Sequence, residues 1–363
     1  MLLLYSVKAF PNLALLRLFA EEGLGADVST LGELEFAQRA GVVAERIVVH
    51  GNNKSDEELH AAANARFVVL DALDEIERAA AAGVQRALVR VTPGIDAETH
   101  DAIKTAHHGS KFGLPPEQAL DAIARARDAG LDAMGLHAHI GSQLLDTDAA
   151  RVTVDWLGAF AARCRAELDW TPRVVDLGGG LGIRHVEAER PPTIGDFVAG
   201  LMDALERAWR LHELPHPELV LEPGRSLVGQ AGLTLYRVGV VKQASAPTTY
   251  VAIDGGMSDN PRPQLYEARY TAVLANRMDE PAREQYAVCG KHCESGDVLI
   301  DRVELPDPRR GDLLAVPATG AYTLGMGSNY NSVPRPAAVL VSDGRARLIR
   351  RRESLDDLLS LEA

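Results

Sequence analysis

Residues 26–49, ADVSTLGELEFAQRAGVVAERIVV, have the pattern of one strand–helix–strand unit. Short apolar runs stand at both ends of this stretch, and the segment between them is rich in Leu, Ala, Glu and Arg, as helices are. We expect Leu31, Leu34 and Phe36 to share the buried face of that helix and Gly41 to end it. Alternation of strand and helix in this way implies a parallel sheet.

Similar apolar runs recur along the first part of the chain, and longer amphipathic segments separate them. We count eight runs over about 220 residues, which fits a closed (β/α)8 TIM barrel. A doubly wound open sheet is the structural alternative that the same alternation allows. The eight predicted strands are Leu4–Val7, Ala26–Val28, Ile47–Val49, Phe67–Leu70, Ala87–Val91, Ala133–Leu136, Val174–Leu177 and Leu219–Leu221.

The pattern changes after Glu222-Pro-Gly-Arg225. β-branched and alternating segments follow, and Gly, Pro and Asp separate them as turns do. We therefore expect a (β/α)8 barrel domain over residues 1–230 and a mostly β C-terminal domain over residues 231–363. The strands predicted in the second domain are Leu233–Val241, Thr248–Ile253, Gln285–Val288, Val298–Ile300, Leu313–Val316 and Ala337–Val341.

Composition and charge narrow the classes of function. Hydrophobic residues make up 46% of the 363 residues and charged residues 25%, which is typical of a globular protein. The formal net charge of −13 disfavours nucleic acid and an anionic membrane surface as partners, because like charges repel on average. Three cysteines are too few for a disulfide scaffold, and the apolar runs are too short to span a membrane. Since the sequence after Met1 does not read as a signal peptide, these features predict a cytoplasmic protein.

Polar side chains gather where the predicted strands end. In a parallel barrel the carboxyl ends of all strands meet on one rim, and that rim carries the chemistry. Polar residues end strands in most proteins. A lysine, several histidines and an acid on one rim are more reactive side chains than that general tendency explains. The residues are Lys8, Asp27 (within its strand), His50, Arg90, His137, His139 and Glu222.

Three motifs could bind a ligand or carry chemistry, although each has a simpler explanation. The glycines of Asp176-Leu-Gly-Gly-Gly-Leu-Gly182 let backbone N–H groups approach an anion, but a plain tight turn accounts for them equally well. Their spacing departs from the dinucleotide-binding fingerprint, which disfavours a dehydrogenase. Glu222 and Arg225 form either a surface ion pair or a site in which Arg225 grips an anion and Glu222 faces a ring nitrogen. Lys8 is either a solvated surface group or an amine that forms a Schiff base at a barrel mouth.

Two groups of side chains raise the question of a metal. His137 and His139 lie on the same side of a predicted strand, but the sequence offers no convincing third ligand. The segment Cys289-Gly-Lys-His-Cys293 has no second thiol pair, so a structural zinc site is disfavoured. We therefore predict no metal. Cys293 and Glu294 are either an acid–base pair in a loop or, for the thiol, a buried and inert group.

Ten motifs resemble the fold-type III pyridoxal-phosphate-dependent decarboxylases, and among them most closely the diaminopimelate decarboxylases. The motifs run in family order over nearly the whole chain, so together they are a stronger signal than any one of them. The resemblance implies a (β/α)8 barrel that carries the cofactor and a β-domain that completes the site, usually from the partner subunit of a homodimer. The motifs are YSVKAFPN, GADVSTLGELEFA, HGNNKSDEEL, SKFGL, GLHAHIGSQ, DLGGGLG, LEPGRSLV, DGGMSDNPRPQLY, HCESGDVL and GAYTLGMGSNYN.

The resemblance also implies roles for individual residues. Lys8 would form a Schiff base with pyridoxal 5'-phosphate, His139 would stack on its ring, and Glu222 would pair with the ring nitrogen. Cys293 matches the proton donor, and Asp27 matches an acid near the lysine. The other implied cofactor-binding residues are Ser142, Gly178, Gly179, Gly180, Gly224, Arg225 and Tyr322, and the implied substrate-binding residues are Arg225, Arg262, Tyr266, Glu294 and Tyr322.

The implied reaction is the decarboxylation of meso-2,6-diaminopimelate to L-lysine and CO2, a step of lysine biosynthesis. Loss of CO2 leaves a carbanion that a protonated pyridine ring absorbs, and a carboxylate beside the ring nitrogen favours that proton. The alternatives are a sibling decarboxylase of another amino acid, such as a carboxylated polyamine or a carrier-bound substrate, and a non-catalytic cofactor-binding homologue. Family members normally carry residues ahead of the lysine-bearing strand, so we expect either a start assigned late or a truncated chain.

Overall fold

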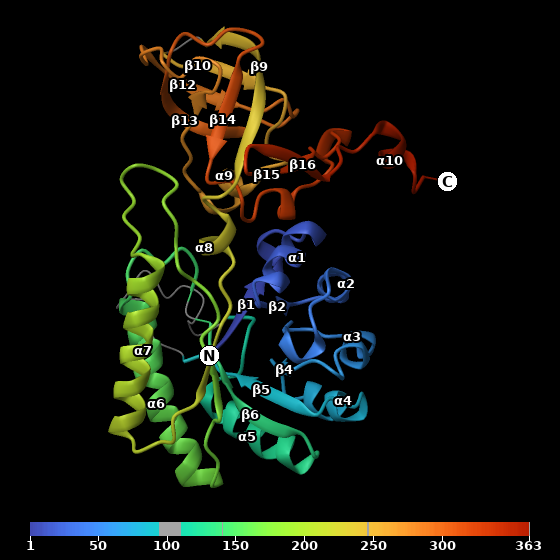
Figure 1. The fold of residues 1–363 in the computed structure, drawn as a ribbon, viewed down its shortest axis with the longest axis vertical. Coiled ribbons are helices and arrows are strands. Elements are labelled where there is room, and N and C mark those ends of the chain that lie inside the picture. The colour runs from blue at the N-terminus through green and yellow to red at the C-terminus, as the bar shows by residue number, and fades with distance from the viewer. Residues whose placement is uncertain (94–109, 140, 245–246, 363) are drawn as a thin grey trace. The chain divides into compact units, whose positions relative to one another are not determined.

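The chain folds into two compact units (Figure 1). A computed structural model describes residues 1–93, 110–139, 141–244 and 247–362. The first unit comprises Met1–Gly182 and Pro191–Ser226, and the second comprises Ile183–Arg190 and Leu227–Ala363. The segment Ile183–Arg190 thus interrupts the first unit in sequence but belongs to the second. The sequence pattern predicted a single boundary after residue 230.

The first unit is a closed parallel barrel. Each strand pairs in parallel with its sequence neighbours, and β1 (Leu2–Ser6) closes the barrel by pairing with β8 (Glu218–Leu221). The prediction of a (β/α)8 barrel is confirmed, and the open sheet is excluded because it has no closing pair. The other strands are β2 (Gly25–Val28), β3 (Ile47–Val49), β4 (Phe67–Leu70), β5 (Arg86–Arg90), β6 (Asp132–His137) and β7 (Val174–Asp176).

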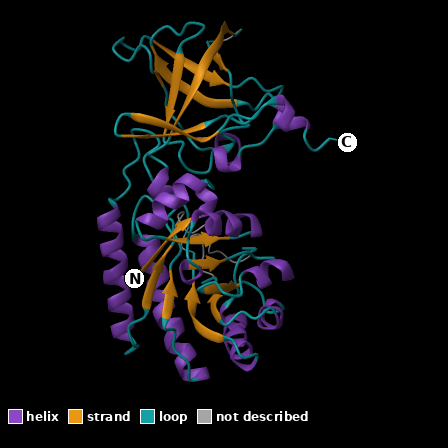
Figure 2. Ribbon diagram, turned by 45° about the vertical axis from the view of Figure 1, so that its right-hand side comes forward, coloured by secondary structure: helices purple, strands orange, loops and turns teal. Residues whose placement is uncertain are grey.

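Apolar side chains from the strands form one buried cluster, and helices surround the strands (Figure 2). Because successive residues of a strand point to opposite faces, Leu2 and Leu4 enter this cluster together, as do Phe67 and Val69. The helices are α1 (Leu13–Glu21), α2 (Leu31–Ala40), α3 (Asp56–Ala61), α4 (Glu75–Ala81), α5 (Pro116–Asp128), α6 (Asp148–Leu168), α7 (Ile194–Leu211) and α8 (Arg225–Val228).

Helix α2 begins and ends where its sequence predicts. Thr30 caps the first turn through its side-chain oxygen, and Gly41 follows the last turn with a φ of 92°, a conformation that favours glycine. The predicted buried face is wrong at Phe36, whose side chain is 38% exposed. Residues three apart share a helix face, and the buried side chains are Leu34, Ala37 and Ala40.

The second unit is built mainly from strands, as predicted. A six-stranded sheet has the order β11-β14-β9-β10-β12-β13, and a separate hairpin pairs β15 with β16. The sequence did not predict β11, which has two residues, or β16, in which arginines interrupt the apolar pattern. The elements are β9 (Leu233–Gln243), β10 (Thr249–Ile253), β11 (Val273–Leu274), β12 (Glu284–Cys289), β13 (Val298–Leu305), β14 (Leu313–Pro317), β15 (Ala338–Ser342), β16 (Arg345–Arg350), α9 (Arg262–Tyr266) and α10 (Leu355–Leu359).

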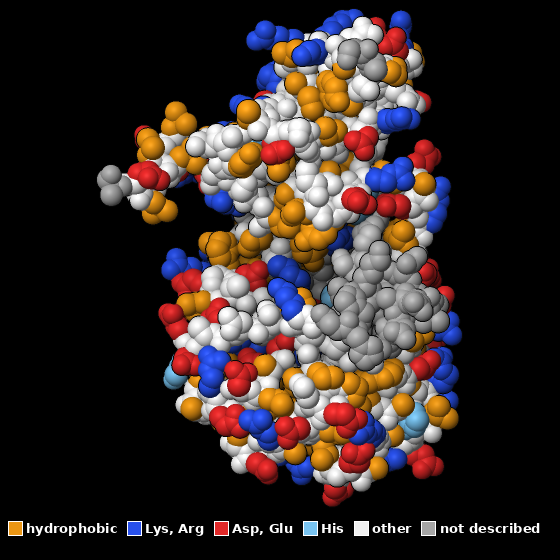
Figure 3. Space-filling view, turned by 180° about the vertical axis from the view of Figure 1, so that it is seen from behind, with side chains coloured by type: hydrophobic (Ala, Val, Ile, Leu, Met, Phe, Trp, Pro, Cys, Tyr) orange, Lys and Arg blue, Asp and Glu red, His pale blue; other side chains and the backbone are white. Residues whose placement is uncertain are grey.

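Charged side chains of both signs are interspersed on the face shown in Figure 3. The formal net charge of −13 is therefore not expressed there as one continuous acidic surface. Among the described residues, no helix combines the length and the apolar character that crossing a membrane requires.

A buried ion pair holds the loop after β3 against β4 and α4. Lys54 Nζ donates to Glu75 Oε1 at 2.5 Å, to Val69 O at 2.6 Å and to Gly51 O at 2.8 Å. The two charged side chains are 1% and 5% exposed. Glu75 also accepts the N–H of Asp71 at 2.9 Å. These contacts fix the loop that follows β3 at the carboxyl end of the barrel.

Replacing Lys54 with methionine is expected to lower the free energy of unfolding by about 3–5 kcal/mol, because Glu75 then stays buried without its cation. Urea denaturation measures the change. The double variant Lys54→Met/Glu75→Leu is the matched control and should recover much of the loss, since it removes both charges. A Lys54→Met protein as stable as the wild type would show that the pair does not hold this loop.

Candidate active site

The carboxyl ends of the barrel strands bring together polar residues from distant parts of the sequence. Asp27 of β2 is in register with Ser6 of β1, and Asp176 of β7 is in register with His137 of β6. Glu222 directly follows β8. Because the strand ends of a parallel barrel meet on one rim, these residues belong to a common mouth.

Lys8 lies beside a buried acid at this rim. It stands in the 3-10 turn Val7–Ala9 after β1, and its Nζ donates to Asp27 Oδ2 at 3.4 Å. The same oxygen accepts from Ser6 Oγ at 2.5 Å. Burial opposes ionisation of Asp27, but Lys8, His50 and the Ser6 hydroxyl together lower its pKa. The Asp27 side chain is 1% exposed and that of Lys8 is 48% exposed, so a buried carboxylate anchors an accessible amine.

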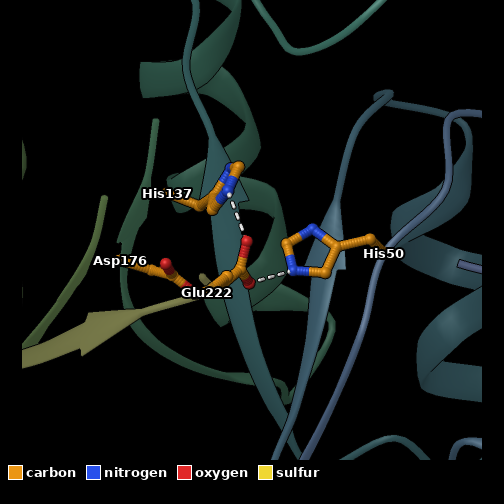
Figure 4. A group of neighbouring side chains, drawn as sticks. All are labelled: His50, His137, Asp176 and Glu222. Carbon is orange, nitrogen blue, oxygen red and sulfur yellow. Dashed lines mark hydrogen bonds and ion pairs between the residues drawn. The ribbon is translucent and has the colours of Figure 1, made fainter. Parts of the chain in front are cut away.

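Four further side chains form a buried group that we call the rim cluster: His50, His137, Asp176 and Glu222 (Figure 4). Their ligand atoms all lie within 4.8 Å of one another. His50 Nε2 donates to Glu222 Oε1 at 2.5 Å, and His137 Nε2 lies 3.7 Å from Glu222 Oε2. The two imidazole rings meet edge to face with their centres 4.8 Å apart. The Glu222 carboxylate thus lies between two histidines.

The charges around the rim cluster shift the protonation of its members. Burial lowers the pKa of His137 well below its usual value. Burial also opposes the charged form of His50, but the carboxylates of Glu222 and Asp27 outweigh it and raise the pKa of His50. Burial and the Glu222 carboxylate raise the pKa of Asp176 to about 8. Near neutral pH the rim cluster therefore holds a neutral His137 and a protonated Asp176, and the neighbouring carboxylates favour the charged form of His50.

The rim cluster contains ligand types that a divalent cation accepts, but its geometry is that of a hydrogen-bonded pair. Donors bound to one tetrahedral zinc ion at about 2.0–2.1 Å are separated from each other by about 3.3 Å. The distance of 2.5 Å between His50 Nε2 and Glu222 Oε1 is much shorter than that. The sequence offered no convincing third ligand beside His137, and the barrel brings His50, Asp176 and Glu222 close to it from other strands.

A glycine turn after β7 approaches the same acid. Gly178 has a φ of 63°, and a Cβ on it would lie 2.6 Å from His139 Nδ1. A Cβ on Gly179 would lie 2.5 Å from the backbone oxygen of Glu222. Both positions therefore require glycine, which leaves bare backbone beside the His139 ring. Burial lowers the pKa of His139 well below its usual value, so this ring is neutral.

The loops after β6 and β8 add further polar groups. Arg225, which begins α8, donates from Nη2 to Ser142 Oγ at 3.2 Å. The Arg225 residue is 8% exposed, so its guanidinium is largely enclosed. Besides Lys8, Asp27 and His139, the implied cofactor residues of the barrel thus lie after the neighbouring strands β6, β7 and β8: Ser142, Gly178, Gly179, Gly180, Glu222, Gly224 and Arg225.

Cys293 and Glu294 lie in the loop of the second unit between β12 and β13, and both are exposed. The Cys293 N–H donates to Asn331 Oδ1 at 2.8 Å. Asp297 fixes the start of the loop, since its Oδ2 accepts the His292 backbone N–H at 3.0 Å and the His292 Nδ1 at 2.7 Å. The His292 side chain is fully enclosed. These hydrogen bonds fix the residue before Cys293, and the Cys293 thiol lies at the surface of this unit.

Arg262 and Tyr266 stand at the two ends of α9 in the second unit. Arg262 is 5% exposed, and its guanidinium lies 5.9 Å from the centre of the Tyr266 ring. Its Nε has no hydrogen-bond partner in the part of the chain that the structure describes. A buried guanidinium with an unused donor suits an anionic ligand. Tyr322, in the same unit, is half-buried and has a φ of 58°.

Sequence reasoning placed His50 at a strand end without assigning it a role, and it treated Asp176 only as the start of the glycine motif. His292 and Asp297 were missed altogether. The residues of the rim cluster are far apart in the sequence, so no spacing rule connects them. The available signal was that each follows or ends a predicted barrel strand, which places all of them on one rim.

Asp176→Asn is expected to change how stability varies with pH. In the folded state Asp176 keeps its proton up to a pH of about 8. In the unfolded chain the same carboxyl has its ordinary pKa of 3.8 and releases the proton at much lower pH. Stability should therefore fall between those values as pH rises, by up to about 1.4 kcal/mol per pH unit. Asparagine cannot ionise and should lessen the fall.

Denaturant unfolding at about pH 5 and about pH 8 measures this difference. Asp203→Asn, an exposed change on α7, is the matched control and should behave like the wild type. An Asp176→Asn protein whose stability falls with pH as steeply as that of the wild type would contradict the assignment.

Comparison with known proteins identifies the family of the chain. Residues 1–229 match the family model described as pyridoxal-dependent decarboxylase, pyridoxal binding domain. The chain is 43% identical over 371 residues to the diaminopimelate decarboxylase of Halalkalibacterium halodurans, across 99% of this chain and 84% of that protein. It is 44% identical over 381 residues to the diaminopimelate decarboxylase of Mycobacterium tuberculosis, across 99% of this chain and 84% of that protein.

A solved structure shows the same architecture. The crystal structure of diaminopimelate decarboxylase from M. jannaschii in complex with L-lysine matches with a TM-score of 0.92 and 34% identity. The match covers 100% of this chain and 84% of that chain. The chain therefore belongs to the pyridoxal-dependent decarboxylases, within the diaminopimelate decarboxylase family.

Proposed function

We propose that this chain is a pyridoxal-phosphate-dependent carboxy-lyase that converts meso-2,6-diaminopimelate into L-lysine and CO2, a step of lysine biosynthesis. One observation carries the proposal: an accessible Lys8 amine, held by the buried Asp27, lies on the same rim as the Glu222 carboxylate and the glycine turn. The family supports it, because the relatives named above are diaminopimelate decarboxylases and one of them was solved with L-lysine.

The residues of the barrel mouth fit pyridoxal phosphate. Lys8 offers the amine for its aldehyde, while the bare backbone of Gly178–Gly180 and the Ser142 hydroxyl offer donors for its phosphate. When bound, the cofactor supplies an electron-accepting ring that stabilises the carbanion left by loss of CO2. The buried Glu222 carboxylate favours a proton on the ring nitrogen. His139 offers a neutral ring face for stacking.

Asp27 and Cys293 have separate roles. Asp27 stabilises a charge on the lysine nitrogen, and Cys293 donates a proton after CO2 has left. Asp27 Oδ2, 3.4 Å from Lys8 Nζ, favours the protonated form of the lysine nitrogen. After CO2 leaves, the substrate carbanion must gain one proton. A thiol can donate that proton, and the Cys293 thiol is exposed and free of a disulfide.

Substrate choice follows from the charges of the second unit. Diaminopimelate carries an amino acid head at each end. Arg262 would bind the distal carboxylate and Glu294 the distal ammonium, with Tyr266, Tyr322 and Arg225 as further substrate contacts. An amino acid with one head would leave the buried Arg262 guanidinium unpaired, and this lowers its affinity.

We infer that the active protein is a homodimer with shared active sites. Lys8 and Glu222 belong to the first unit, whereas Arg262, Cys293 and Glu294 belong to the second. The site residues that the resemblance implies therefore come from both units. The resemblance to fold-type III decarboxylases supports completion of each site by the partner subunit.

We place the reaction in the cytoplasm. The cysteines Cys164, Cys289 and Cys293 are all free in the structure. Burial raises the pKa of Cys164 to about 12, so that thiol is inert toward oxidation. A chain without disulfides is typical of a reducing compartment.

Purified protein supplied with pyridoxal phosphate should release CO2 from meso-diaminopimelate and form L-lysine. Lys8→Ala should lose both the turnover and the absorbance of the lysine-bound cofactor, because no amine remains to hold the aldehyde. The exposed Lys242→Ala is the matched control and should match the wild type. Higher kcat/KM on another amino acid or a carboxylated polyamine would contradict the substrate, and cofactor binding without any CO2 release would indicate a non-catalytic homologue.

Cys293→Ala should lower turnover by about 10²-fold or more if its thiol donates the proton. Mixing this variant with Lys8→Ala then tests the shared site. After subunit exchange, half of the dimers are mixed and carry one intact site each, so about a quarter of the wild-type activity should return. Activity that stays at the level of the separate variants, with exchange shown by mass spectrometry, would contradict shared sites.

A further inference from the structure

His50 lies between two carboxylates that the proposed function assigns to opposite ends of the cofactor. Its Nε2 is 2.5 Å from Glu222 Oε1 and 3.7 Å from Asp27 Oδ1. Figure 4 shows the imidazole of His50 approaching the Glu222 carboxylate from the end of β3. The His50 side chain is 7% exposed, so bulk water does not replace either contact. His50 therefore connects the two acids.

The chain of contacts continues from Asp27 to the lysine. The other oxygen of Asp27, Oδ2, accepts from Ser6 Oγ at 2.5 Å and from Lys8 Nζ at 3.4 Å. Positive and negative groups thus alternate in the order Lys8, Asp27, His50, Glu222. The two acids are 2% and 4% exposed, so solvent screens these interactions much less than at the surface. A change of charge at Glu222 therefore alters the electrostatic energy at Lys8, and the reverse also holds.

The groups that face His50 decide its charge. They are Asp27 from β2, Glu33 from α2, His137 from β6, Asp176 from β7 and Glu222 after β8. Burial disfavours the imidazolium, but the two nearest carboxylates raise the pKa of His50 above its usual value. Its backbone N–H donates to the oxygen of Val28 at 2.7 Å, which fixes the residue against β2.

We propose that His50 is a positioning residue with two separable effects on the cofactor site. Its ring N–H holds the Glu222 carboxylate in place for the ring nitrogen, and its positive charge couples that carboxylate to the Lys8–Asp27 pair. The proposal rests on the proposed function, because Lys8 and Glu222 must serve one cofactor. The first effect needs only a hydrogen-bond donor, whereas the second needs a charge.

His50→Gln and His50→Phe separate the two effects, because glutamine supplies a donor without a charge and phenylalanine supplies neither. In His50→Phe the dissociation constant of pyridoxal phosphate should increase about 10-fold or more, since a hydrogen bond to a charged group is lost. His50→Gln should recover most of that affinity. Both variants should raise, by about one unit, the pH at which the Lys8-bound cofactor titrates, because removing a nearby positive charge favours the protonated lysine nitrogen.

Equilibrium dialysis measures the affinity, and absorbance of the bound cofactor against pH measures the titration. His60→Gln, exposed on α3, is the matched control and should keep both wild-type values. Circular dichroism checks the fold of each variant, and the conservative His50→Gln decides the charge effect if His50→Phe does not fold.

The outcomes distinguish this inference from the proposed function. A wild type that does not bind pyridoxal phosphate at Lys8 overturns the proposed function. A wild type that binds, with His50 variants that match it in affinity and titration, overturns only the role of His50. Lower affinity with an unchanged titration also overturns the coupling, because it leaves His50 a purely structural part.

Discussion

The barrel mouth depends on the compensation of buried negative charge. Asp27, Asp176 and Glu222 are 2%, 0% and 4% exposed, and they sit at the carboxyl ends of strands that a closed parallel barrel must bring to one rim. Two like charges about 4 Å apart repel by about 4 kcal/mol at an effective dielectric constant of about 20. The protein relieves this repulsion by keeping Asp176 protonated and by placing His50 and Lys8 against the other two acids.

The proposed function assigns the groups that bind one cofactor to different elements of the fold. A cationic ring nitrogen needs a fixed carboxylate, a role that the proposed function gives to Glu222, which His50 contacts. A phosphate needs backbone donors without obstructing side chains, and the proposed function gives this role to the turn at Gly178 and Gly179, where a Cβ would clash with neighbouring atoms. Proton donation is assigned to Cys293, in a loop of the second unit whose start is held by Asp297. In the proposed function the barrel strands position the charges, and loops carry the groups that contact the substrate.

Much of the fold could be predicted because it rests on local patterns. The eight apolar runs became the eight barrel strands, since short β-branched runs between amphipathic segments have few other solutions. Phe36 was misplaced because residues 31, 34 and 36 do not lie on one helical face. The two-residue β11 and the arginine-rich β16 carry too little apolar pattern to be recognised. The resemblance supplied Lys8, Glu222 and Cys293, but the contact of His50 with Glu222 joins distant strands and becomes visible only once the barrel closes.

Reduction of the cofactor-loaded protein with borohydride, followed by mass mapping of its peptides, tests the central claim most directly. Borohydride fixes pyridoxal phosphate to whichever amine holds it. The account predicts one modified peptide, with the pyridoxyl group on Lys8 and in proportion to the protein. Modification of another lysine, such as Lys291 or Lys242, or no modified peptide from a protein loaded with cofactor, would contradict it.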